Sequence, residues 1–226
     1  MSADASGKRP AVIFGIGDYA RIASVYLRDD SPYDVAAFTV HERYIEETEL
    51  LGIPIVPFET LEQSHPPSSC ELLVAVGYSG TNQRRAEVYE ECKSRGYDFL
   101  TYVHSGVHVF EESKIGENTF IFEDNVLQPF TTVGNDVVMW SGNHFGHDST
   151  IGDHCFIASH VVISGNTTIG PYTFVGVNAT FRDDINVGAK NIIGAGAVIM
   201  RDTEEGDVFP VRHSEAHTKK SWELDF

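Results

Sequence analysis

The stretch VGNDVVMWSGNHFGHDSTIGDHCFIASHVVISGNTTIG, residues 133–170, carries an apolar residue at every sixth position. The repeat runs without a slip from Val103 to Ile199, and all seventeen positions in this register are apolar. A period of six fits neither the 3.6 residues of a helical turn nor the alternation of a simple strand. It is typical of a hexapeptide β-helix, in which short strands are joined by corners. Three hexads complete one coil of eighteen residues, so the sequence predicts between five and six coils.

Glycine adds a second period, of eighteen residues. It directly follows the apolar residue in every third hexad, at five places, but does so in only three of the remaining hexads. This asymmetry favours a prism with three walls, and it predicts that one corner needs either backbone freedom or a close approach of two chain segments. The five glycines are Gly116, Gly134, Gly152, Gly170 and Gly188, and the other three are Gly146, Gly176 and Gly194.

The first hundred residues show a different pattern, in which apolar strands alternate with helical segments. This order predicts a small parallel α/β sheet. The expected strands are Ala11–Phe14, Val35–Val40, Ile53–Val56 and Leu72–Val76, and the expected helices are Tyr19–Arg28, Phe58–Gln63 and Asn82–Arg95.

A glycine turn follows the first of these strands, where Gly15, Gly17 and Ala20 match the order G-x-G-x-x-A. Such a turn at the start of a helix suits an anion, because the free backbone N–H groups point toward it. The alternative is that this glycine turn serves only the packing of the helix against the strand and binds no anion. Only one strand–helix–strand half is present, which indicates one nucleotide rather than a dinucleotide.

Net charge and cysteine content indicate which binding partners and which cellular compartment fit the chain. The formal net charge is −17 at pH 7, which argues against nucleic acid or an anionic membrane as partner. A phosphate-bearing ligand must therefore be held by local donors, although the charge is equally explained by solubility or adaptation to high salt.

The three cysteines are far apart and odd in number, which predicts free thiols in a reducing cytoplasm. No secretory signal and no membrane span are expected from this sequence.

Four histidines, His144, His147, His154 and His160, fall within twenty-one residues of the repeat. Their places in the hexads put them on different walls of the prism, whereas zinc needs three or four ligands that meet in space. The pattern therefore predicts no metal site. His144 and His147 flank one corner and can act together, while His154 and His160 are expected to be surface or inter-coil residues.

The two halves together resemble the bacterial sugar acyltransferases that modify nucleotide-linked amino sugars. These include the bacillosamine-type and perosamine N-acetyltransferases, with sialic-acid O-acetyltransferases as cousins, and the resemblance extends from Ala11 to about Asp202. Its most specific piece is a histidine and an acidic residue just before an I-G hexad, here His147 and Asp148. The resemblance implies that His147 is the general base and that Asp148 raises its basicity. It also implies acetyl-CoA or another acyl-CoA as cosubstrate, no metal, and a cytoplasmic homotrimer with the active site between neighbouring β-helices.

The resemblance also implies binding residues. An acyl-CoA is expected at Phe156, Gly165, Val177 and Ala195, and the nucleotide-linked sugar at Gly15, Gly17, Asp18, Tyr19, Val40, His41 and Gly77, with Asn143 and His144 near the acceptor sugar. Gly165 follows His147 by eighteen residues and so belongs to the same corner, where its backbone N–H can stabilise the oxygen of a tetrahedral intermediate.

Three positions depart from the family pattern. Tyr19 stands where many members have histidine, and Val40–His41 stand where many have two acidic residues. The chain also lacks the family's G-x-P-A-K segment near CoA and has FPVRHSEAH instead, in which Arg212 and His213, or Lys219 and Lys220 further on, are candidates for a phosphate.

The sequence thus predicts a Rossmann-like nucleotide-sugar-binding domain at 1–102, a left-handed β-helix acyltransferase domain at 103–202 and a tail at 203–226. The expected activity is transfer of an acyl group to the amine of a nucleotide-linked amino-deoxy sugar for lipopolysaccharide or glycan synthesis. The alternatives are O-acylation of a sugar hydroxyl, transfer of a larger acyl group such as hydroxybutyryl, and a β-helix that binds without catalysis.

Overall fold

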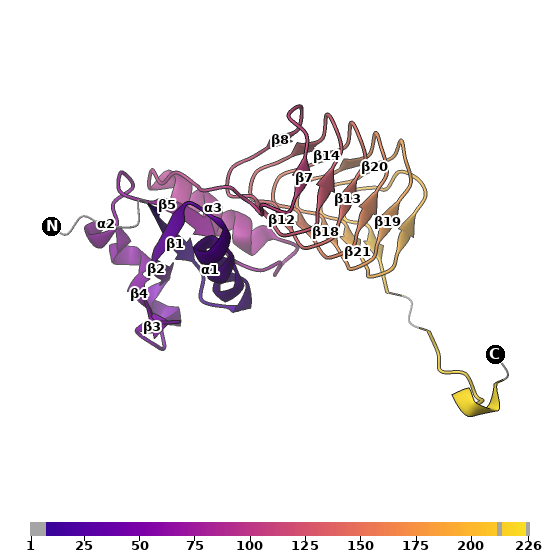
Figure 1. Cartoon of the computed structure of the whole chain (residues 1–226), viewed down its shortest axis with the longest axis horizontal. Helices are drawn as coiled ribbons and strands as arrows, with labels where there is room; N and C mark the ends of the chain where they lie inside the picture. Colours follow the sequence, from indigo (N-terminus) through magenta and orange to yellow (C-terminus); the bar gives the residue numbers. More distant parts are fainter. Residues whose placement is uncertain (1–7, 212–213, 225–226) are drawn as a thin grey trace.

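The computed structural model describes residues 8–211 and 214–224. Figure 1 shows an α/β domain, a β-helix of stacked coils beside it, and a tail that leads away from the last coil. This arrangement confirms the predicted fold class, an α/β domain followed by a left-handed parallel β-helix. No helix in this part of the chain is long and apolar enough to cross a membrane. Arg212 and His213, two of the four phosphate candidates in the tail, lie outside the described residues.

The N-terminal domain is built on a five-stranded sheet in the order β3-β4-β2-β1-β5. All of its pairings are parallel except that of β3 with β4, which is antiparallel. The four predicted strands are present, β3 is an additional short edge strand, and the helix predicted at 58–63 is divided into η2 and α2. The bounds are β1 Arg9–Phe14, α1 Asp18–Asp30, β2 Tyr33–Val40, η1 Glu42–Tyr44, β3 Glu49–Leu50, β4 Ile53–Pro57, η2 Phe58–Thr60, α2 Leu61–Ser64, β5 Glu71–Val74 and α3 Gln83–Ser94, with η3 Ser221–Glu223 in the tail.

The β-helix contains one two-residue strand for every predicted hexad, and no inserted loop interrupts it. Its strands form three parallel sheets. Wall 1 holds β6, β9, β12, β15, β18, β21 and β23, wall 2 holds β7, β10, β13, β16, β19 and β22, and wall 3 holds β8, β11, β14, β17 and β20. The strands are β6 Tyr102–Val103, β7 His108–Val109, β8 Lys114–Ile115, β9 Phe120–Ile121, β10 Val126–Leu127, β11 Thr132–Val133, β12 Val138–Met139, β13 His144–Phe145, β14 Thr150–Ile151, β15 Phe156–Ile157, β16 Val162–Ile163, β17 Thr168–Ile169, β18 Phe174–Val175, β19 Thr180–Phe181, β20 Asn186–Val187, β21 Ile192–Ile193, β22 Val198–Ile199 and β23 Val208–Phe209.

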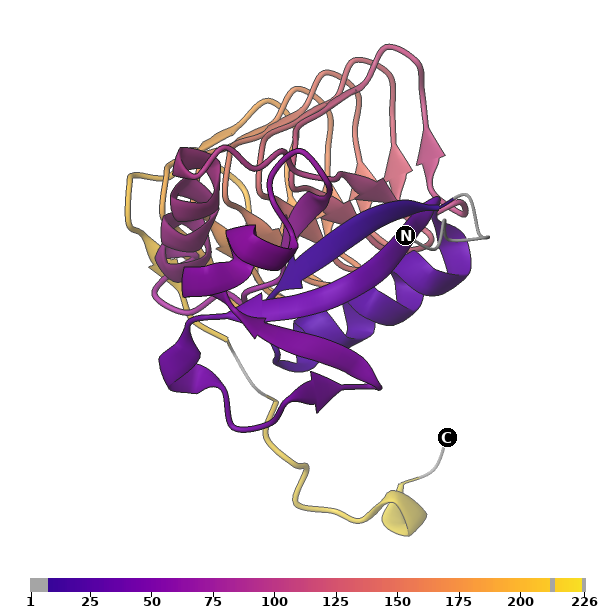
Figure 2. The same ribbon diagram turned by 90° about the vertical axis from the view of Figure 1, so that its left-hand side faces the viewer.

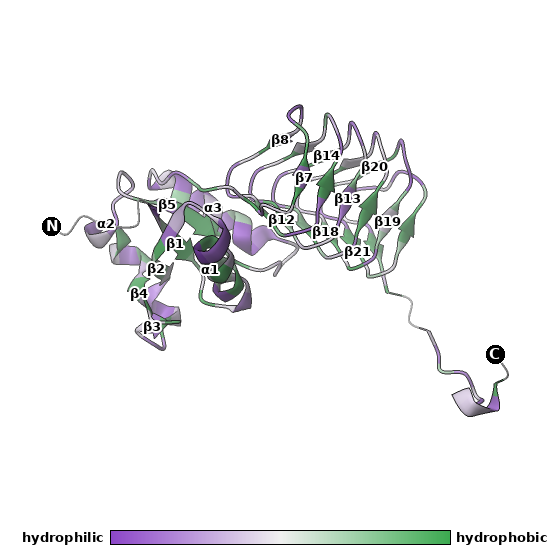
Figure 3. Cartoon of the chain, viewed as in Figure 1, coloured by the Kyte–Doolittle hydropathy of each residue, from purple (hydrophilic) through white to green (hydrophobic). Residues whose placement is uncertain are grey.

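The hexad pattern arises because the second residue of each strand points into the prism. These residues make up most of one continuous buried cluster. Figure 3 shows hydrophobic strands separated by more hydrophilic corners. Burial of a large aliphatic or aromatic side chain contributes about 1.5–3 kcal/mol, so a polar residue in this register would be strongly disfavoured.

The corners need a left-handed backbone, and this need recurs every six residues. The fourth residue of each hexad from 118 to 196 has a positive φ, and asparagine, aspartate, glycine and histidine occupy most of these places. Such residues adopt this conformation at the lowest cost. Asp148, His154 and His160 all stand at corner positions of this kind, with φ values of 56°, 61° and 59°.

The five glycines of wall 3 are needed because the neighbouring coil lies very close to them, and not because their backbone has a positive φ. A Cβ on Gly152 would lie 2.7 Å from the nitrogen of Pro171 in the next coil, and one on Gly116 would lie 2.6 Å from the carbonyl oxygen of Gly134. Of the two reasons that the sequence allowed, the structure supports the contact between successive coils.

Wall 1 carries the α/β domain. The buried stripe of α1, which includes Tyr19, Ala23 and Leu27, shares one apolar cluster with Phe120 and Val138 of the wall. Figure 2 shows the sheet in front of the coils, with α1 and α3 between them. The N-terminal domain and the first coils are therefore held together by a common core.

Arg85 of α3 adds a polar contact at this junction, from a fully buried position. Its Nε lies 3.1 Å from Oδ1 of Asp136, and its Nη2 donates to the backbone oxygens of Asp136, His154 and Cys155 at 3.1, 2.8 and 3.1 Å. Asp136 also accepts a 2.7 Å hydrogen bond from Asn118 and contacts His154 Nδ1 at 2.8 Å. Because both charged groups are paired and hydrogen-bonded, their burial is compensated. The orientation of α3 on the β-helix is fixed by this contact.

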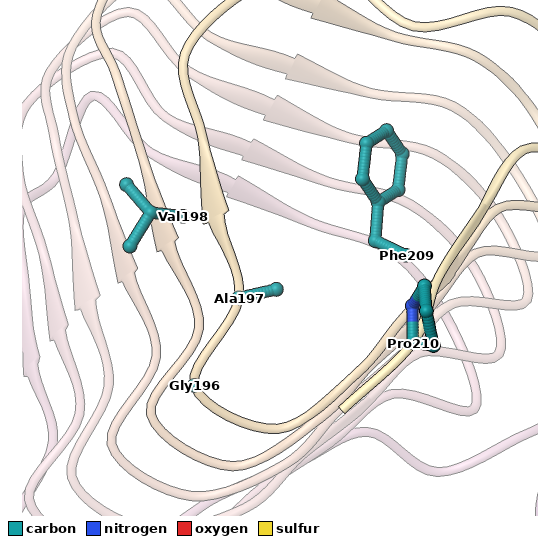
Figure 4. Close-up of a pocket in the computed structure, with 5 residues that line it drawn as sticks. All are labelled: Gly196, Ala197, Val198, Phe209 and Pro210. Carbon is teal, nitrogen blue, oxygen red and sulfur yellow. The ribbon is translucent and has the colours of Figure 1, made fainter. Parts of the chain in front are cut away.

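The hexad register ends at Ile199. The next strand, β23, lies at Val208–Phe209 and returns to wall 1, where it pairs with β21. The last coil leaves a hollow of about 460 Å³, lined by Gly196, Ala197, Val198, Phe209 and Pro210. Figure 4 shows these residues around the end of the prism.

Candidate active site

His147 lies at the corner between walls 2 and 3, in the turn between β13 and β14. Its backbone N–H donates to Oε1 of Gln128 at 2.9 Å, which anchors the corner to the coil below. Its ring Nδ1 lies 2.9 Å from Oδ2 of Asp148, and both side chains are about half exposed. An ionised carboxylate only accepts hydrogen bonds, so Nδ1 carries the proton and Nε2 is left as a proton acceptor.

Gly165 occupies the same corner one coil further on, as the repeat predicts. A Cβ on this residue would lie 2.7 Å from Nε2 of His147, so the imidazole ring lies directly against the glycine. Within the described residues, the Gly165 N–H makes no hydrogen bond. A free basic nitrogen therefore stands next to a free backbone donor, which is the pair of groups that acyl transfer needs.

Replacing Gly165 with alanine should displace the base without unfolding the coil. The glycine has no positive φ, so alanine is tolerated by the backbone, and only the mobile imidazole has to move. A displacement of about 1 Å at a catalytic group costs on the order of 10²-fold, so we expect a fall of this size in the kcat of the acyl transfer proposed below. Circular dichroism should show an unchanged melting temperature.

Gly106→Ala is the matched control, because its Cβ would press on His104 Nδ1 at 3.1 Å, away from this corner. Wild-type kcat in Gly165→Ala would contradict the assignment of the corner.

The other three histidines take different places. His154 is buried beneath the α/β domain and bonded to Asp136, as an inter-coil residue. His160 stands at a corner with its ring over Gly142, and His144 faces outward from wall 2. Among residues 8–211 and 214–224, no three histidine, cysteine, aspartate or glutamate side chains gather as metal ligands.

Two side chains that the hexads place at inward corners are structural. Asn143, expected near the acceptor sugar, is 1% exposed, and its side chain bonds the carbonyl of Trp140 and the N–H of Val161, the latter at 2.7 Å. It holds successive coils together and offers no free polar atom to a sugar. Cys155 is also buried, and desolvation raises the pKa of its thiol to about 12, so it is not a nucleophile.

Four of the residues expected to bind the nucleotide-linked sugar line a cavity of about 470 Å³ between the α/β domain and wall 1. Gly17, Asp18 and Tyr19 line it from the start of α1, and Gly77 lines it from the loop after β5. Gly15 lies just behind, with a φ of +130°, and a Cβ there would meet the Ala75 oxygen at 2.6 Å. The turn thus needs glycine for both conformation and space, and the first amides of α1 remain open to the cavity.

Tyr19 also carries a buried polar group. Its hydroxyl is the one buried side-chain oxygen or nitrogen without a hydrogen-bond partner in the described part of the chain. Burial raises the pKa of this hydroxyl above its usual range, so it remains a donor. An unpaired buried hydroxyl of this kind costs free energy.

His41 lies nearby but is already occupied. Its Nδ1 is 3.2 Å from Glu59 and its Nε2 is 3.4 Å from Glu91, so the ring has no nitrogen free for a substrate.

A second cavity, of about 570 Å³, lies on the other side of Ile16 and is lined by Val40, Tyr44, Glu46, Glu47, Glu49, Leu50 and Ile55. The acidic run after the second strand was visible in the sequence, but only the fold shows that it lines a cavity.

An apolar groove of about 570 Å³ runs along wall 1 and its corner with wall 2. Phe156, Val177 and Ala195, three of the residues expected to contact an acyl-CoA, line it. Tyr78, Trp140 and Phe174 also line it and were not predicted, because the loop at Tyr78 reaches the wall only in the folded chain. Gly165, the fourth expected contact, belongs to the corner of walls 2 and 3 beside His147 and not to this groove.

Comparison with known proteins supports the fold. The family described as bacterial transferase hexapeptide (six repeats) matches residues 130–165. The acetyltransferase domain of PglB from Neisseria gonorrhoeae FA1090, solved with acetyl coenzyme A, is 22% identical with a TM-score of 0.78, over 91% of this chain and 97% of that one. PerB from Caulobacter crescentus, solved with CoA and GDP-perosamine, is 23% identical with a TM-score of 0.79, over 89% and 94%. WeeI from Acinetobacter baumannii AYE is 18% identical with a TM-score of 0.75, over 89% and 96%. No curated protein sequence matches the chain. The chain therefore shares the hexapeptide fold of these proteins, including the N-terminal α/β domain.

Proposed function

We propose that this protein transfers an acyl group from an acyl-CoA, most simply acetyl-CoA, to the amino group of a nucleotide-linked amino sugar. One observation carries the proposal: Nε2 of His147, oriented by Asp148, stands beside the free N–H of Gly165. The solved complexes with acetyl coenzyme A and with CoA and GDP-perosamine support the choice of both substrates, since those proteins share the fold.

The chemistry follows from these groups. His147 Nε2 accepts a proton from the sugar amine while the amine nitrogen attacks the thioester carbonyl carbon. The carbonyl oxygen becomes negatively charged and accepts a hydrogen bond from the Gly165 N–H. When the carbon–sulfur bond breaks, the imidazolium returns the proton to the departing thiolate. Asp148 acts as a positioning residue, since it fixes the ring tautomer and stabilises the imidazolium.

The site needs a second copy of the chain. Within one chain, His147 lies at one edge of wall 2 and the apolar groove lies at the other edge. Wall 2 exposes the valines Val162, at 40%, and Val198, at 62%, whereas wall 3 presents lysine, threonine and asparagine outward. If wall 2 faces a three-fold axis, each His147 meets the groove of the neighbouring chain. A homotrimer therefore completes the site.

The cavity at the start of α1 supports this choice of acceptor. A sugar diphosphate would meet the open amides of Gly17 to Tyr19, and the sugar would lie toward Tyr78 and Trp140, which line this cavity and the groove alike. The amine of the sugar would thus approach the thioester where the two spaces join. The three buried free thiols agree with a reaction in the cytoplasm.

The proposal is tested by release of the CoA thiol. Purified protein is incubated with acetyl-CoA and matched pairs of nucleotide-linked sugars that carry either an amine or a hydroxyl at one position. We expect thiol release with amine sugars, and calorimetry should show tighter binding of the nucleotide-linked sugar than of the free sugar. Release with hydroxyl acceptors alone would identify an O-acyltransferase, and absence of release with every donor would favour a binding protein.

A further inference from the structure

The β-helix has very few cations for a domain that is proposed to hold a phosphate-rich cosubstrate. Residues 103–209 contain fourteen acidic side chains and only four basic ones, Lys114, Arg182, Lys190 and Arg201. CoA carries a diphosphate and a further phosphate, so repulsion by this domain must be overcome locally. The positions of the four cations therefore limit where those phosphates can lie.

Two of the four are poorly placed. Lys114 stands in the first coil of wall 3, at the end of the prism next to the α/β domain. Lys190 follows wall 3 and is paired with Glu205 at 2.7 Å. Neither lies at the corner of walls 2 and 3, where the thioester would react.

Arg201 stands at that corner, in register with the proposed base. Steps of eighteen residues lead from His147 through Gly165 and Asp183 to Arg201. Hydrogen bonds from Asn166 N–H to His147 O at 2.9 Å and from Asp184 N–H to Gly165 O at 3.1 Å confirm that the first three stack coil on coil. The Arg182 N–H donates to Ile199 O at 2.9 Å, which places the coil of Arg201 next in the stack.

The side chain of Arg201 is also available. It is exposed, and it makes no ion pair or hydrogen bond among the described residues. The carboxylate of its neighbour Asp202 instead accepts the N–H of Asn186 at 2.8 Å. Arg182 stands in the coil below, with its Nε 3.7 Å from Asp183, and its Nη1 reaches toward Met200 O at 3.5 Å. Both guanidinium groups thus lie at the same edge as the base.

The spacing matches the cosubstrate. Successive coils are separated by about 4.8 Å, so Arg201 lies roughly 14 Å from His147 along the edge. The pantetheine arm between sulfur and diphosphate is about as long as four extended residues, or roughly 14 Å. A thioester held between His147 and Gly165, with its arm running toward the C-terminal coils, would bring the diphosphate to Arg201.

We propose that Arg201, assisted by Arg182, binds the phosphate groups of the acyl-CoA. This inference rests on the proposed function, and it identifies cations for a chain that lacks the family's G-x-P-A-K segment. Guanidinium groups pair with phosphates through two parallel hydrogen bonds, which suits this role.

The test compares two donors that differ only in phosphate. With acetyl-CoA, Arg201→Gln should raise KM about tenfold with little change in kcat, because the variant loses the charged hydrogen bonds to the phosphate. With the acetyl thioester of pantetheine, which has no diphosphate, the variant and the wild type should have the same KM. Lys190→Gln, which removes an equal charge from another corner, should leave both KM values unchanged.

Other results would contradict the proposed binding of phosphate by Arg201. An equal loss with both donors would show that Arg201→Gln damages the coil rather than phosphate binding. An unchanged KM in Arg201→Gln, or a rise in Lys219→Gln and Lys220→Gln instead, would place the phosphates elsewhere, while wild-type turnover of acetyl-CoA would still support the proposed function. If the wild type uses neither donor, the proposed function itself fails.

Discussion

Replacing His147 with alanine should lower kcat by about 10² to 10⁴-fold, the usual contribution of a positioned general base. The amine of the acceptor is mostly protonated at neutral pH, so a variant without the base loses the step that makes the nitrogen nucleophilic. Affinity for acyl-CoA and thermal stability should change little, because the His147 side chain is half exposed and its ring bonds only Asp148. Steady-state kinetics and a thermal melt on the same preparation measure these quantities.

Three variants serve as controls for this result. Asp148→Asn should cost less than His147→Ala, since it alters the orientation and charge of the base without removing it. His160→Ala should be nearly neutral, because His160 stands at a different corner. Should His144→Ala abolish activity while His147→Ala leaves it intact, the base has been assigned to the wrong residue, although the fold is unaffected.

Replacing Arg85 with methionine should destabilise the protein by about 3–5 kcal/mol, the cost of leaving one charge of a buried pair without its partner. Asp136 is 0% exposed and would lose its contact with Nε, the carbonyl of His154 would lose its donor, and the carbonyl of Cys155 would keep only the N–H of Val138. Urea unfolding at one fixed protein concentration measures the change, since assembly would make the midpoint depend on concentration.

The neighbouring Arg84 supplies a matched control. It forms an exposed ion pair with Glu87, and such pairs contribute about 0–1 kcal/mol, so Arg84→Met should be close to neutral. The double variant Arg85→Met, Asp136→Asn should regain part of the lost stability, because the unpaired charge is removed as well. Equal effects of Arg84→Met and Arg85→Met would show that the buried pair does not hold the two domains together.

The sequence predicted the β-helix almost residue by residue, since every predicted hexad became one strand. This success has a physical cause: each coil must bury one residue per wall, so a single slip would turn the apolar register out of the core. The same register placed His147 and Gly165 at one corner, because a strict repeat fixes which residues stack.

The contacts between the two domains could not be predicted in this way. Arg85 belongs to a helix rich in charged residues and meets Asp136, 51 positions later, only in the folded chain. Tyr78 likewise reaches Phe156 and Phe174 through a loop that no repeat positions. Asn143 was expected near the acceptor sugar together with His144, but its place in the hexad directs it inward to bond successive coils.

The most direct measurement is the mass and chemical stability of the product. Wild-type protein, acetyl-CoA and a nucleotide-linked amino sugar are incubated, and the sugar nucleotide is analysed by mass spectrometry before and after treatment with hydroxylamine. We expect one added acetyl group that resists hydroxylamine, as an amide does, and that is nearly absent when His147→Ala replaces the wild type. A product that hydroxylamine cleaves, or no acetylated sugar nucleotide from any amine acceptor and acyl-CoA, would contradict the assignment of N-acyl transfer to this corner.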